Sequence, residues 1–437
     1  MSSNISQSRR WFLRVAGTAG VASMTGLAGC MGGSGDDSGN NSTGSKGGQM
    51  ANKVRLYNMG SLQYDPGTAK NLKRFEEETG ITVEVSEVPW SNLKTTLITE
   101  FRTESAKVDA FMAPTWWLAD FVTAGWISPL GLSDDHMKKF PKNLRKLVTF
   151  DGNVYLAPSY GKWGSFVYNK PYLSKHGLDT PPGTWEEVIS MGKKLKSGSA
   201  IPFAVAWDTR AIFTFKSLLY QAGGQLFDEN NQPTFVDKGT QVFDEYLLPL
   251  QKQGLFPRGM TSWNTSAIRD NFVPGNLAMT ESWTPLATWV LDTKWNKSRL
   301  GSAKIPKGPV SRATFQDSAG VVVSAFSERK GAAKKLAEFM SSTESIKRDM
   351  LVEGNPAVVP AVYDDPEIRD EFPSDLLEDL KYNLRHAKSE IYRAQPEVDE
   401  AISNQITPAL LGDKPPAKAL KQAESDITQL YQNLGIL

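Results

Sequence analysis

Several short stretches of this 437-residue chain place aromatic rings beside side chains that form hydrogen bonds. A sugar ring packs its apolar C–H face on an aromatic ring, and its rim of hydroxyl groups needs donors and acceptors. The residues in these stretches are therefore candidate contacts for a carbohydrate. They are Gln63 and Tyr64, Trp116 and Trp117, Tyr160, Lys162 and Trp163, Trp207, Asp208 and Arg210, Trp263, and Glu281 and Trp283.

Residue types that would indicate catalysis or metal binding do not form a known pattern. His136, His176 and His386 each stand apart from any other His or Cys, so zinc-site spacing is absent. The sequence contains no phosphate-binding loop, dinucleotide fingerprint, nucleophile elbow or zinc-protease motif. Residues 228–232 resemble a calcium loop, but Pro233 stands where that loop needs glycine. We therefore expect no catalytic residue, no bound metal ion and no cofactor.

The charges of the chain nearly cancel. Its 49 Lys and Arg residues and 48 Asp and Glu residues give a formal net charge of +1. Three of the arginines belong to the N-terminal leader described next, and without them 46 basic side chains face 48 acidic ones. Phosphate binding needs a clear basic excess or stripe, so this balance argues against nucleic acid as a partner.

The N-terminal leader carries two adjacent arginines and ends at the single cysteine of the chain. Arg9 and Arg10 precede an uncharged stretch over residues 15–29, which Cys30 follows. That stretch is shorter than the roughly 20 apolar residues that a membrane-spanning helix needs. The pattern predicts a twin-arginine lipoprotein signal over residues 1–29, with Cys30 carrying the lipid. Residues 30–50 are mainly Gly, Ser, Asn and Asp and lack aromatic rings, and this composition predicts a flexible stalk.

Strands and helices alternate after the stalk. We expect strands at 53–57, 81–85 and 108–112, and helices at 66–79, 90–101 and 115–123. Such alternation favours a mainly parallel sheet that is covered by helices on both faces. Ligands of these sheets bind at the carboxyl ends of the strands, where loops 58–65 and 113–117 should lie.

The second half of the chain continues the alternation. Helices are expected at 184–196, 212–221, 237–253, 284–291 and 330–340 and in the C-terminal tail, with strands at 203–206, 277–280 and 320–323. Glycine pairs at 160–164 and prolines at 305–309 suggest crossovers between two lobes. About 390 residues beyond the stalk are also too many for one ordinary core.

Eight sequence motifs occur in one order along the chain: 75–83, Asp109, 125–130, 151–158, 168–170, 181–187, 272–283 and 318–321. Together they resemble the sugar-type extracellular solute-binding proteins of ABC importers. The resemblance implies an α/β fold with two lobes of the Venus-flytrap type. It divides the chain into residues 51–160 with about 311–360, and about 161–310 with 361–437.

The resemblance also implies how such a protein works. A carbohydrate would bind in the cleft, the lobes would close around it, and the closed form would be read by permease subunits that work with a cytoplasmic ATPase. The protein would be a non-enzymatic monomer, held by its lipid on the outer face of the cell membrane. Trp283 falls where the family carries a stacking ring. Trp116 and Trp117 replace an acidic and basic pair that a familiar member carries.

Two other functions remain open from the sequence. A receptor for a phosphorylated polyol or a polyamine would need charged groups in the cleft, and Lys162 with Arg210 balance Asp208 with Glu281. A surface glycoside hydrolase would need two carboxyl groups across the cleft, and no motif fixes such a pair.

Overall fold

The computed structural model describes residues 51–208, 211–291 and 297–437. The predicted signal and stalk, with Arg9, Arg10 and Cys30, lie outside these ranges, as does Arg210. Among the described residues, no helix has both the length and the apolar character needed to cross a membrane.

One mixed sheet of nine strands forms the centre of the described chain, with the order β2-β1-β3-β11-β7-β9-β8, while β10 pairs with β7 and β4 with β11. The strands are β1 (Lys53–Met59), β2 (Thr82–Val88), β3 (Ala110–Pro114), β4 (Ile127–Ser128), β7 (Ala157–Asn169), β8 (Ile201–Val205), β9 (Leu277–Trp283), β10 (Leu300–Ala303) and β11 (Gln316–Ser324). A separate small hairpin joins β5 (Thr149–Phe150) to β6 (Asn153–Val154).

The sheet is less parallel than the sequence predicts. β1 pairs in parallel with β2 and β3, and β8 pairs in parallel with β9. The long strands β7 and β11, however, run antiparallel to each other and to their outer neighbours β9 and β3. The expectation of a mainly parallel sheet is wrong for these central strands, because they connect the two halves of the molecule instead of alternating with helices.

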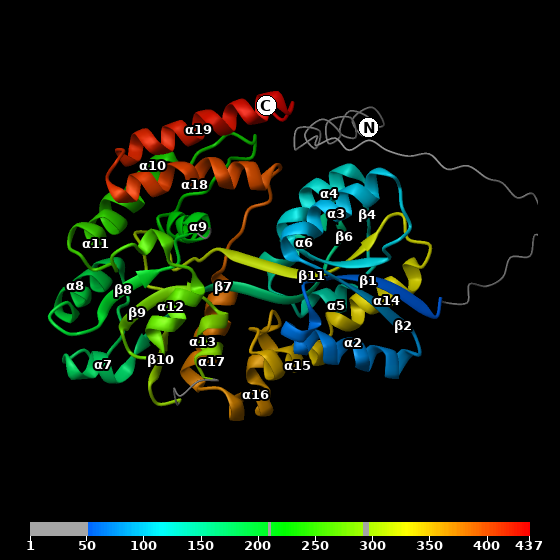
Figure 1. Ribbon diagram of the computed structural model, residues 1–437, viewed down its shortest axis with the longest axis horizontal. Coiled ribbons are helices and arrows are strands. Elements are labelled where there is room, and N and C mark those ends of the chain that lie inside the picture. Colours follow the sequence, from blue (N-terminus) through cyan, green and yellow to red (C-terminus); the bar gives the residue numbers. More distant parts are fainter. Residues whose placement is uncertain (1–50, 209–210, 292–296) are drawn as a thin grey trace, which may run out of the picture.

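The strand β7 belongs to both halves of the molecule. Its first part pairs with β11 as far as Trp163, which lies opposite Gln316, and from Gly164 onward it pairs with β9. Figure 1 shows β7 and β11 running between one group of elements around β1 and another around β9. The predicted α/β fold with two lobes is confirmed. We call the half around β1 lobe 1 and the half around β9 lobe 2.

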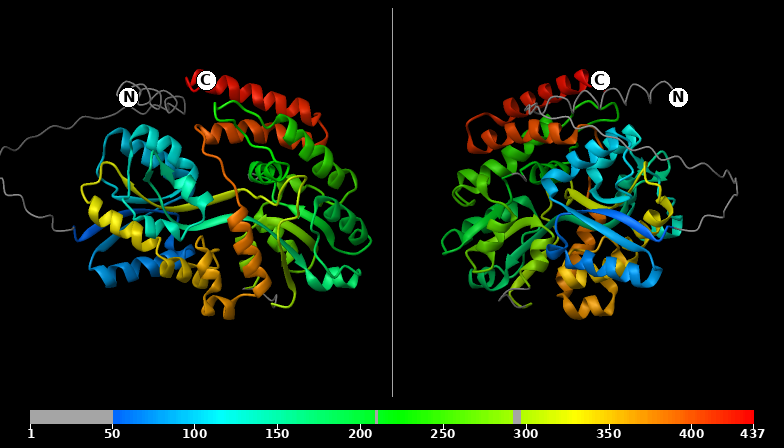
Figure 2. Two further views of the ribbon diagram at one scale, coloured as in Figure 1. Left: turned by 180° about the vertical axis from the view of Figure 1, so that it is seen from behind. Right: turned by 45° about the vertical axis from the view of Figure 1, so that its right-hand side comes forward.

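Helices cover both faces of the sheet in lobe 1. They are α2 (Pro66–Thr79), α3 (Trp90–Arg102), α4 (Leu118–Ala124), α5 (Asp134–Lys138), α6 (Lys142–Val148), α14 (Lys330–Met340) and α15 (Thr343–Glu353). Side chains of β3 alternate between two cores: Ala110 and Met112 join the core under α2 and α14, while Phe111 joins the core under α3 and α4. Figure 2 shows the sheet between these two layers.

Lobe 2 has a similar layered arrangement. Its helices are α7 (Lys170–Lys175), α8 (Trp185–Leu195), α9 (Ala211–Gln221), α10 (Val236–Val242), α11 (Leu248–Lys252), α12 (Thr265–Phe272), α13 (Pro285–Trp289), α17 (Ser374–His386), α18 (Gln395–Leu411) and α19 (Pro416–Asn433), with α16 (Pro366–Glu371) leading into α17. The C-terminal helices α18 and α19 pack on α9 and α10.

Local sequence signals explain several helix boundaries. Helix α2 has Asp65 as N-cap, which accepts a hydrogen bond from the Thr68 N–H, and it ends at Gly80 with φ 69°. The predicted helix over 237–253 is interrupted by a π-helical turn over Phe243–Leu247. Pro249 follows this turn in α11, and a proline there removes one N–H from the helical ladder.

Three segments meet between the lobes, and we call them the hinge segments: residues 160–164 of β7, 313–317 and 387–394. Gln316 lies opposite Trp163, and Phe315 forms a bridge with Lys388. The predicted crossover at 305–309 is misplaced, because Lys307 pairs with Thr184 beside α8, inside lobe 2. The chain crosses several residues later, where β11 begins.

Candidate ligand site

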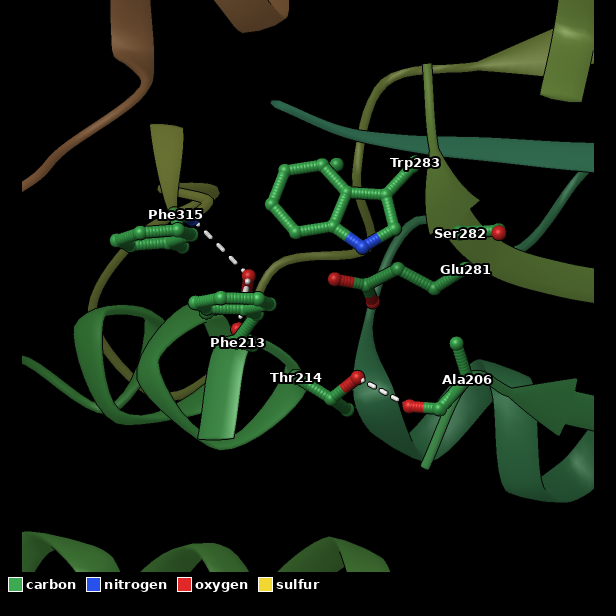
Figure 3. Close-up of a pocket in the computed structure, with 9 residues that line it drawn as sticks. Ala206, Phe213, Thr214, Glu281, Ser282, Trp283 and Phe315 are labelled. Carbon is green, nitrogen blue, oxygen red and sulfur yellow. Dashed lines mark hydrogen bonds between the residues drawn. The ribbon is translucent and has the colours of Figure 1, made fainter. Parts of the chain in front are cut away.

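A small pocket opens where β9 ends beside the hinge segments. It encloses about 320 Å³, its open mouth included, and is lined by Gly164, Ala206, Phe213, Thr214, Ser217, Glu281, Ser282, Trp283 and Phe315. Its walls therefore come from β7, β9, the start of α9 and one residue of the second hinge segment (Figure 3). This is the carboxyl end of β8 and β9, where ligands of α/β sheets bind.

Three aromatic rings form one wall of the pocket. Phe213 and Phe315 stack with their ring centres 5.1 Å apart and their planes at 6°. Trp283 stands edge-on to both, with its ring centre 5.5 Å from Phe213 and 6.0 Å from Phe315. Figure 3 shows the indole beside the two phenyl rings. Such a wall can pack against the C–H face of a sugar ring.

Lys216 supports this aromatic wall from the protein interior. Its ammonium group lies 5.7 Å from the Phe213 ring centre and 5.0 Å from that of Phe315, which are cation–π distances. The same group donates to the Tyr392 hydroxyl and to Asp399, whose Oδ1 is 2.7 Å away. Lys216 is fully buried. It therefore ties α9 to α18 and to the third hinge segment.

Glu281 is the ionisable side chain that lines this pocket. Its carboxyl group is buried and accepts a hydrogen bond of 3.1 Å from the Gln221 amide. Gln221 in turn accepts a bond of 2.6 Å from Trp185 Nε1. An indole N–H can only donate, so the Gln221 oxygen must face Trp185 and its NH₂ group must face Glu281. Burial raises the pKa of Glu281 to about 7.

The tryptophans after β3 form a second aromatic group in lobe 1. Trp117 is buried in the core and stacks on Trp90 with ring centres 5.3 Å apart and planes at 6°. Trp116 is partly buried and meets both rings edge-on. Trp90 is 46% exposed. Trp90 is the first residue of the helix predicted over 90–101, so this exposed ring was missed as a candidate contact.

Other predicted residues are distributed along the hinge and the lobe surfaces. Tyr160 and Lys162 are partly buried on β7, with the Lys162 ammonium 5.7 Å from the Tyr160 ring centre. Gln63 and Tyr64 are exposed in the short 3₁₀ turn η1 (Leu62–Tyr64). Asp208 is partly buried just after β8. None of these lines the pocket at Trp283.

Several predicted tryptophans have a core position in this structure. Trp163 and Trp207 are fully buried, and Trp207 Nε1 donates to Thr407 Oγ1 over 3.0 Å. Trp263 is partly buried, and its carbonyl accepts from the Trp207 N–H. Like Trp117, Trp163 and Trp207 can act on a ligand here only by supporting the residues in front of them.

The structure thus brings Glu281 and Trp283 together and adds two rings that the sequence did not single out. Phe213 was missed because it stands in an apolar run of the helix predicted over 212–221, whereas Phe315 lies among polar residues in a segment for which no element was predicted. A weak signal exists for Phe213, since it follows the polar stretch at 207–210 by three residues.

Two lobes joined by hinge segments, with a pocket at the carboxyl ends of the strands, define a solute-binding protein of the two-lobe class. The sequence profile of the bacterial extracellular solute-binding proteins matches residues 60–347, which is more than half of the chain. The protein belongs to this family.

Relatives of known sequence agree with this assignment. A protein of Brucella abortus described as a candidate binding protein is 25% identical over 275 residues, which are 61% of this chain and 66% of the relative. The match thus spans just under two thirds of that protein. A probable amino-acid ABC transporter periplasmic-binding protein of Sinorhizobium fredii is 24% identical over 386 residues, 83% of this chain and 86% of the relative.

Solved structures agree with the fold. A maltose-bound protein of T. maritima superposes with a TM-score of 0.75 at 23% sequence identity, covering 86% of this chain and 99% of the other. At this identity the likeness establishes the two-lobe fold.

Proposed function

We propose that the protein is the substrate-binding component of an ABC importer and that it captures a mono- or oligosaccharide outside the membrane. The observation that carries this proposal is the pocket at the end of β9, where an aromatic wall of Trp283, Phe213 and Phe315 lines the same space as the Glu281 carboxyl. Aromatic rings and a carboxylate serve the two chemical faces of a sugar, its C–H surface and its hydroxyl groups.

The charges at the pocket argue against an anionic ligand. Among the described residues that line it, Glu281 is ionisable and neither Lys nor Arg occurs. Lys216 stands behind the rings and is already bonded to Asp399. A phosphorylated solute needs several cations or helix N-termini at its phosphate, so this pocket supports a sugar or polyol over a phosphate ester. The maltose in the T. maritima neighbour is in keeping with that choice.

Ligand capture proceeds by closure of the lobes. The pocket wall belongs mainly to lobe 2, whereas Gln63, Tyr64 and Trp116 stand on lobe 1. A ligand that contacts both groups only in the closed form shifts the population toward that form. The closed protein is then the form that the permease recognises, and the permease works with a cytoplasmic ATPase. The protein acts as a monomer and leaves its ligand chemically unchanged.

A ligand panel tests this function. Isothermal titration calorimetry and thermal melting are run with neutral mono- and oligosaccharides, mannitol, glycerol 3-phosphate, spermidine and amino acids. A neutral sugar or polyol should raise the melting temperature, since 100 times Kd stabilises the folded state by about 2.7 kcal/mol. Binding of amino acids alone, which the Sinorhizobium relative's description suggests, would refute the carbohydrate assignment. Steady turnover of the bound sugar would refute a purely binding role.

We also propose that the chain is exported by the twin-arginine route and anchored through Cys30. The order of Arg9, Arg10, the uncharged stretch and Cys30 motivates this proposal. Cys30→Ser should release the protein from the membrane fraction, while replacing Arg9 and Arg10 by lysine should stop export. Cell fractionation followed by immunoblotting measures both membrane attachment and export. Firm attachment of the Cys30→Ser protein would contradict the anchor.

A further inference from the structure

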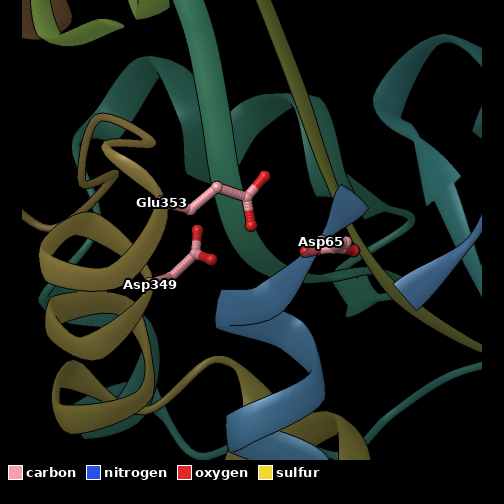
Figure 4. Close-up of side chains that lie close together, drawn as sticks. All are labelled: Asp65, Asp349 and Glu353. Atoms are coloured by element: carbon pink, nitrogen blue, oxygen red, sulfur yellow. The ribbon is translucent and has the colours of Figure 1, made fainter. Parts of the chain in front are cut away.

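Three carboxyl side chains converge where α2 begins and α15 ends. Asp65 is the N-cap of α2, and Asp349 and Glu353 lie one turn apart at the end of α15. One oxygen from each lies within 4.8 Å of the other two. Figure 4 shows the side chains around the space between the two helices. α2 and α15 pack against each other, although they are far apart in sequence.

One of these carboxyl groups is buried with an oxygen that has no partner. Asp349 is 7% exposed, and its Oδ1 accepts no hydrogen bond from any described residue. That oxygen lies against Gly67, where an added Cβ would be 2.0 Å from it. The Gly67 N–H donates to Glu353 Oε2 over 3.3 Å, so the unpaired oxygen faces the same turn that Glu353 contacts. A buried oxygen of this kind requires a partner.

Neighbouring groups hold the three side chains in place. Asp65 accepts from the Thr68 N–H over 3.3 Å. The buried Asn355 side chain lies beside Asp349 and Glu353 and favours the ionised form of both carboxyl groups. Ligands of a metal site are commonly oriented by such outer contacts. The carboxyl groups are therefore set in position before any ion arrives.

We propose that Asp65, Asp349 and Glu353 bind a divalent cation of the calcium type. A hard cation takes oxygen ligands at about 2.3 to 2.6 Å, so two oxygens on one ion lie at most about 5 Å apart. The oxygens of the triad satisfy that limit. The cluster contains neither His nor Cys, which zinc would prefer. Water completes the coordination shell. The proposal departs from the expectation, drawn from sequence spacing alone, that the protein binds no metal.

The ion has a structural consequence for lobe 1. Asp65 directly follows η1, which carries Gln63 and Tyr64. An ion shared with α15 ties that turn to the helix and so fixes the loop that faces lobe 2. The proposed calcium site can be tested independently of the carbohydrate function, because calcium binding is measured without any sugar.

Calcium binding by the chelator-treated protein tests the site. CaCl2 or MgCl2 is titrated by calorimetry, and melting temperature is followed in parallel. We expect one calcium ion per chain, with Kd on the order of 10⁻⁴ to 10⁻³ M, as in extracellular calcium modules, and a weaker response to magnesium. Asp349→Asn and Glu353→Gln should each weaken calcium binding more than tenfold. Glu344→Gln, on the exposed first turn of α15, should leave it unchanged.

Three outcomes would overturn the proposal. The first is no calcium binding by the unchanged protein. The second is calcium binding by Asp349→Asn and by Glu353→Gln that is as tight as in the unchanged protein. The third is a triad-dependent response to an amine such as glucosamine in place of calcium. Circular dichroism of each variant verifies folding. Because Glu353 is only partly buried, its variant serves as the test if Asp349→Asn fails to fold.

Discussion

Trp283 is the residue on which ligand contact most directly depends. Trp283→Ala removes the ring that stands edge-on to Phe213 and Phe315. Losing the ring contact and its burial should cost about 2 to 4 kcal/mol of binding, or about 30- to 1000-fold in affinity. Titration calorimetry measures the loss.

A buried tryptophan supplies the matched control. Trp163 lies on the neighbouring strand and is fully buried, so Trp163→Ala should lower the free energy of unfolding by about 3 to 5 kcal/mol. Trp283 is only partly buried, so its variant should melt at nearly the original temperature. If Trp283→Ala sharply lowers the melting temperature and leaves the ligand affinity unchanged, Trp283 stabilises the fold and does not contact the ligand.

The ionisation of Glu281 should control ligand affinity. Its pKa of about 7 lies above the ordinary 4.5, so the folded protein binds this proton more tightly than the unfolded chain does. Ligand-free stability should therefore fall as pH rises from about 4.5 to about 7. The ionised form accepts bonds from sugar hydroxyls, so affinity should rise about tenfold between pH 6 and pH 8.

Glu281→Gln is the control for this pH dependence. The amide keeps the shape of the side chain but does not titrate, so both pH profiles should become flatter. Calorimetry at several pH values measures affinity, and thermal melting measures stability. An affinity that falls toward pH 8 would show that the neutral carboxyl, acting as a donor, is the binding form.

At the scale of elements, β11 depends on a glycine at its irregular point. The register between β11 and β7 shifts between Ala319 and Gly320. A Cβ on Gly320 would lie 1.9 Å from the carbonyl oxygen of Ala157, and backbone cannot move aside cheaply. Gly320→Ala should therefore lower the free energy of unfolding by about 3 kcal/mol or more.

Gly331→Ala is the matched control, because it is also a glycine-to-alanine substitution. It lies in α14, and an added Cβ meets nothing within 4 Å. Gly331→Ala should stabilise by up to about 1 kcal/mol, because alanine favours the helix. Denaturant unfolding compares the two variants. Equal effects would mean that the close approach at Gly320 is relieved by a small shift of the strands.

Elements could be predicted from the sequence where periodicity and caps agree. Asp65 and Gly80 bound α2, and Thr184 begins α8. The crossover at 305–309 was wrong because prolines mark an irregular segment without saying which lobe it packs on. Two of the three rings of the aromatic wall were also missed, since Phe213 and Phe315 meet only when α9 approaches a hinge segment about 100 residues away in the sequence.

At the scale of the whole molecule, ligand binding should make the protein more compact. Small-angle X-ray scattering with and without the best ligand of the panel measures the radius of gyration. It should decrease with ligand, because contacts from both lobes favour the closed form. The Trp283→Ala protein at the same ligand concentration should respond less. An unchanged radius at saturating ligand would contradict closure.

Two hydrogen bonds link the buried Trp185 indole through Gln221 to the Glu281 carboxyl, so the Trp185 ring should be sensitive to the ionisation of Glu281. Trp185 is buried and stacks on Tyr246, so solvent and ligand cannot touch its ring. When Glu281 loses its proton, its bond from Gln221 strengthens and polarises the bond from the indole N–H. The fluorescence of Trp185, which no ligand contacts, should therefore respond to the ionisation of Glu281 in the pocket.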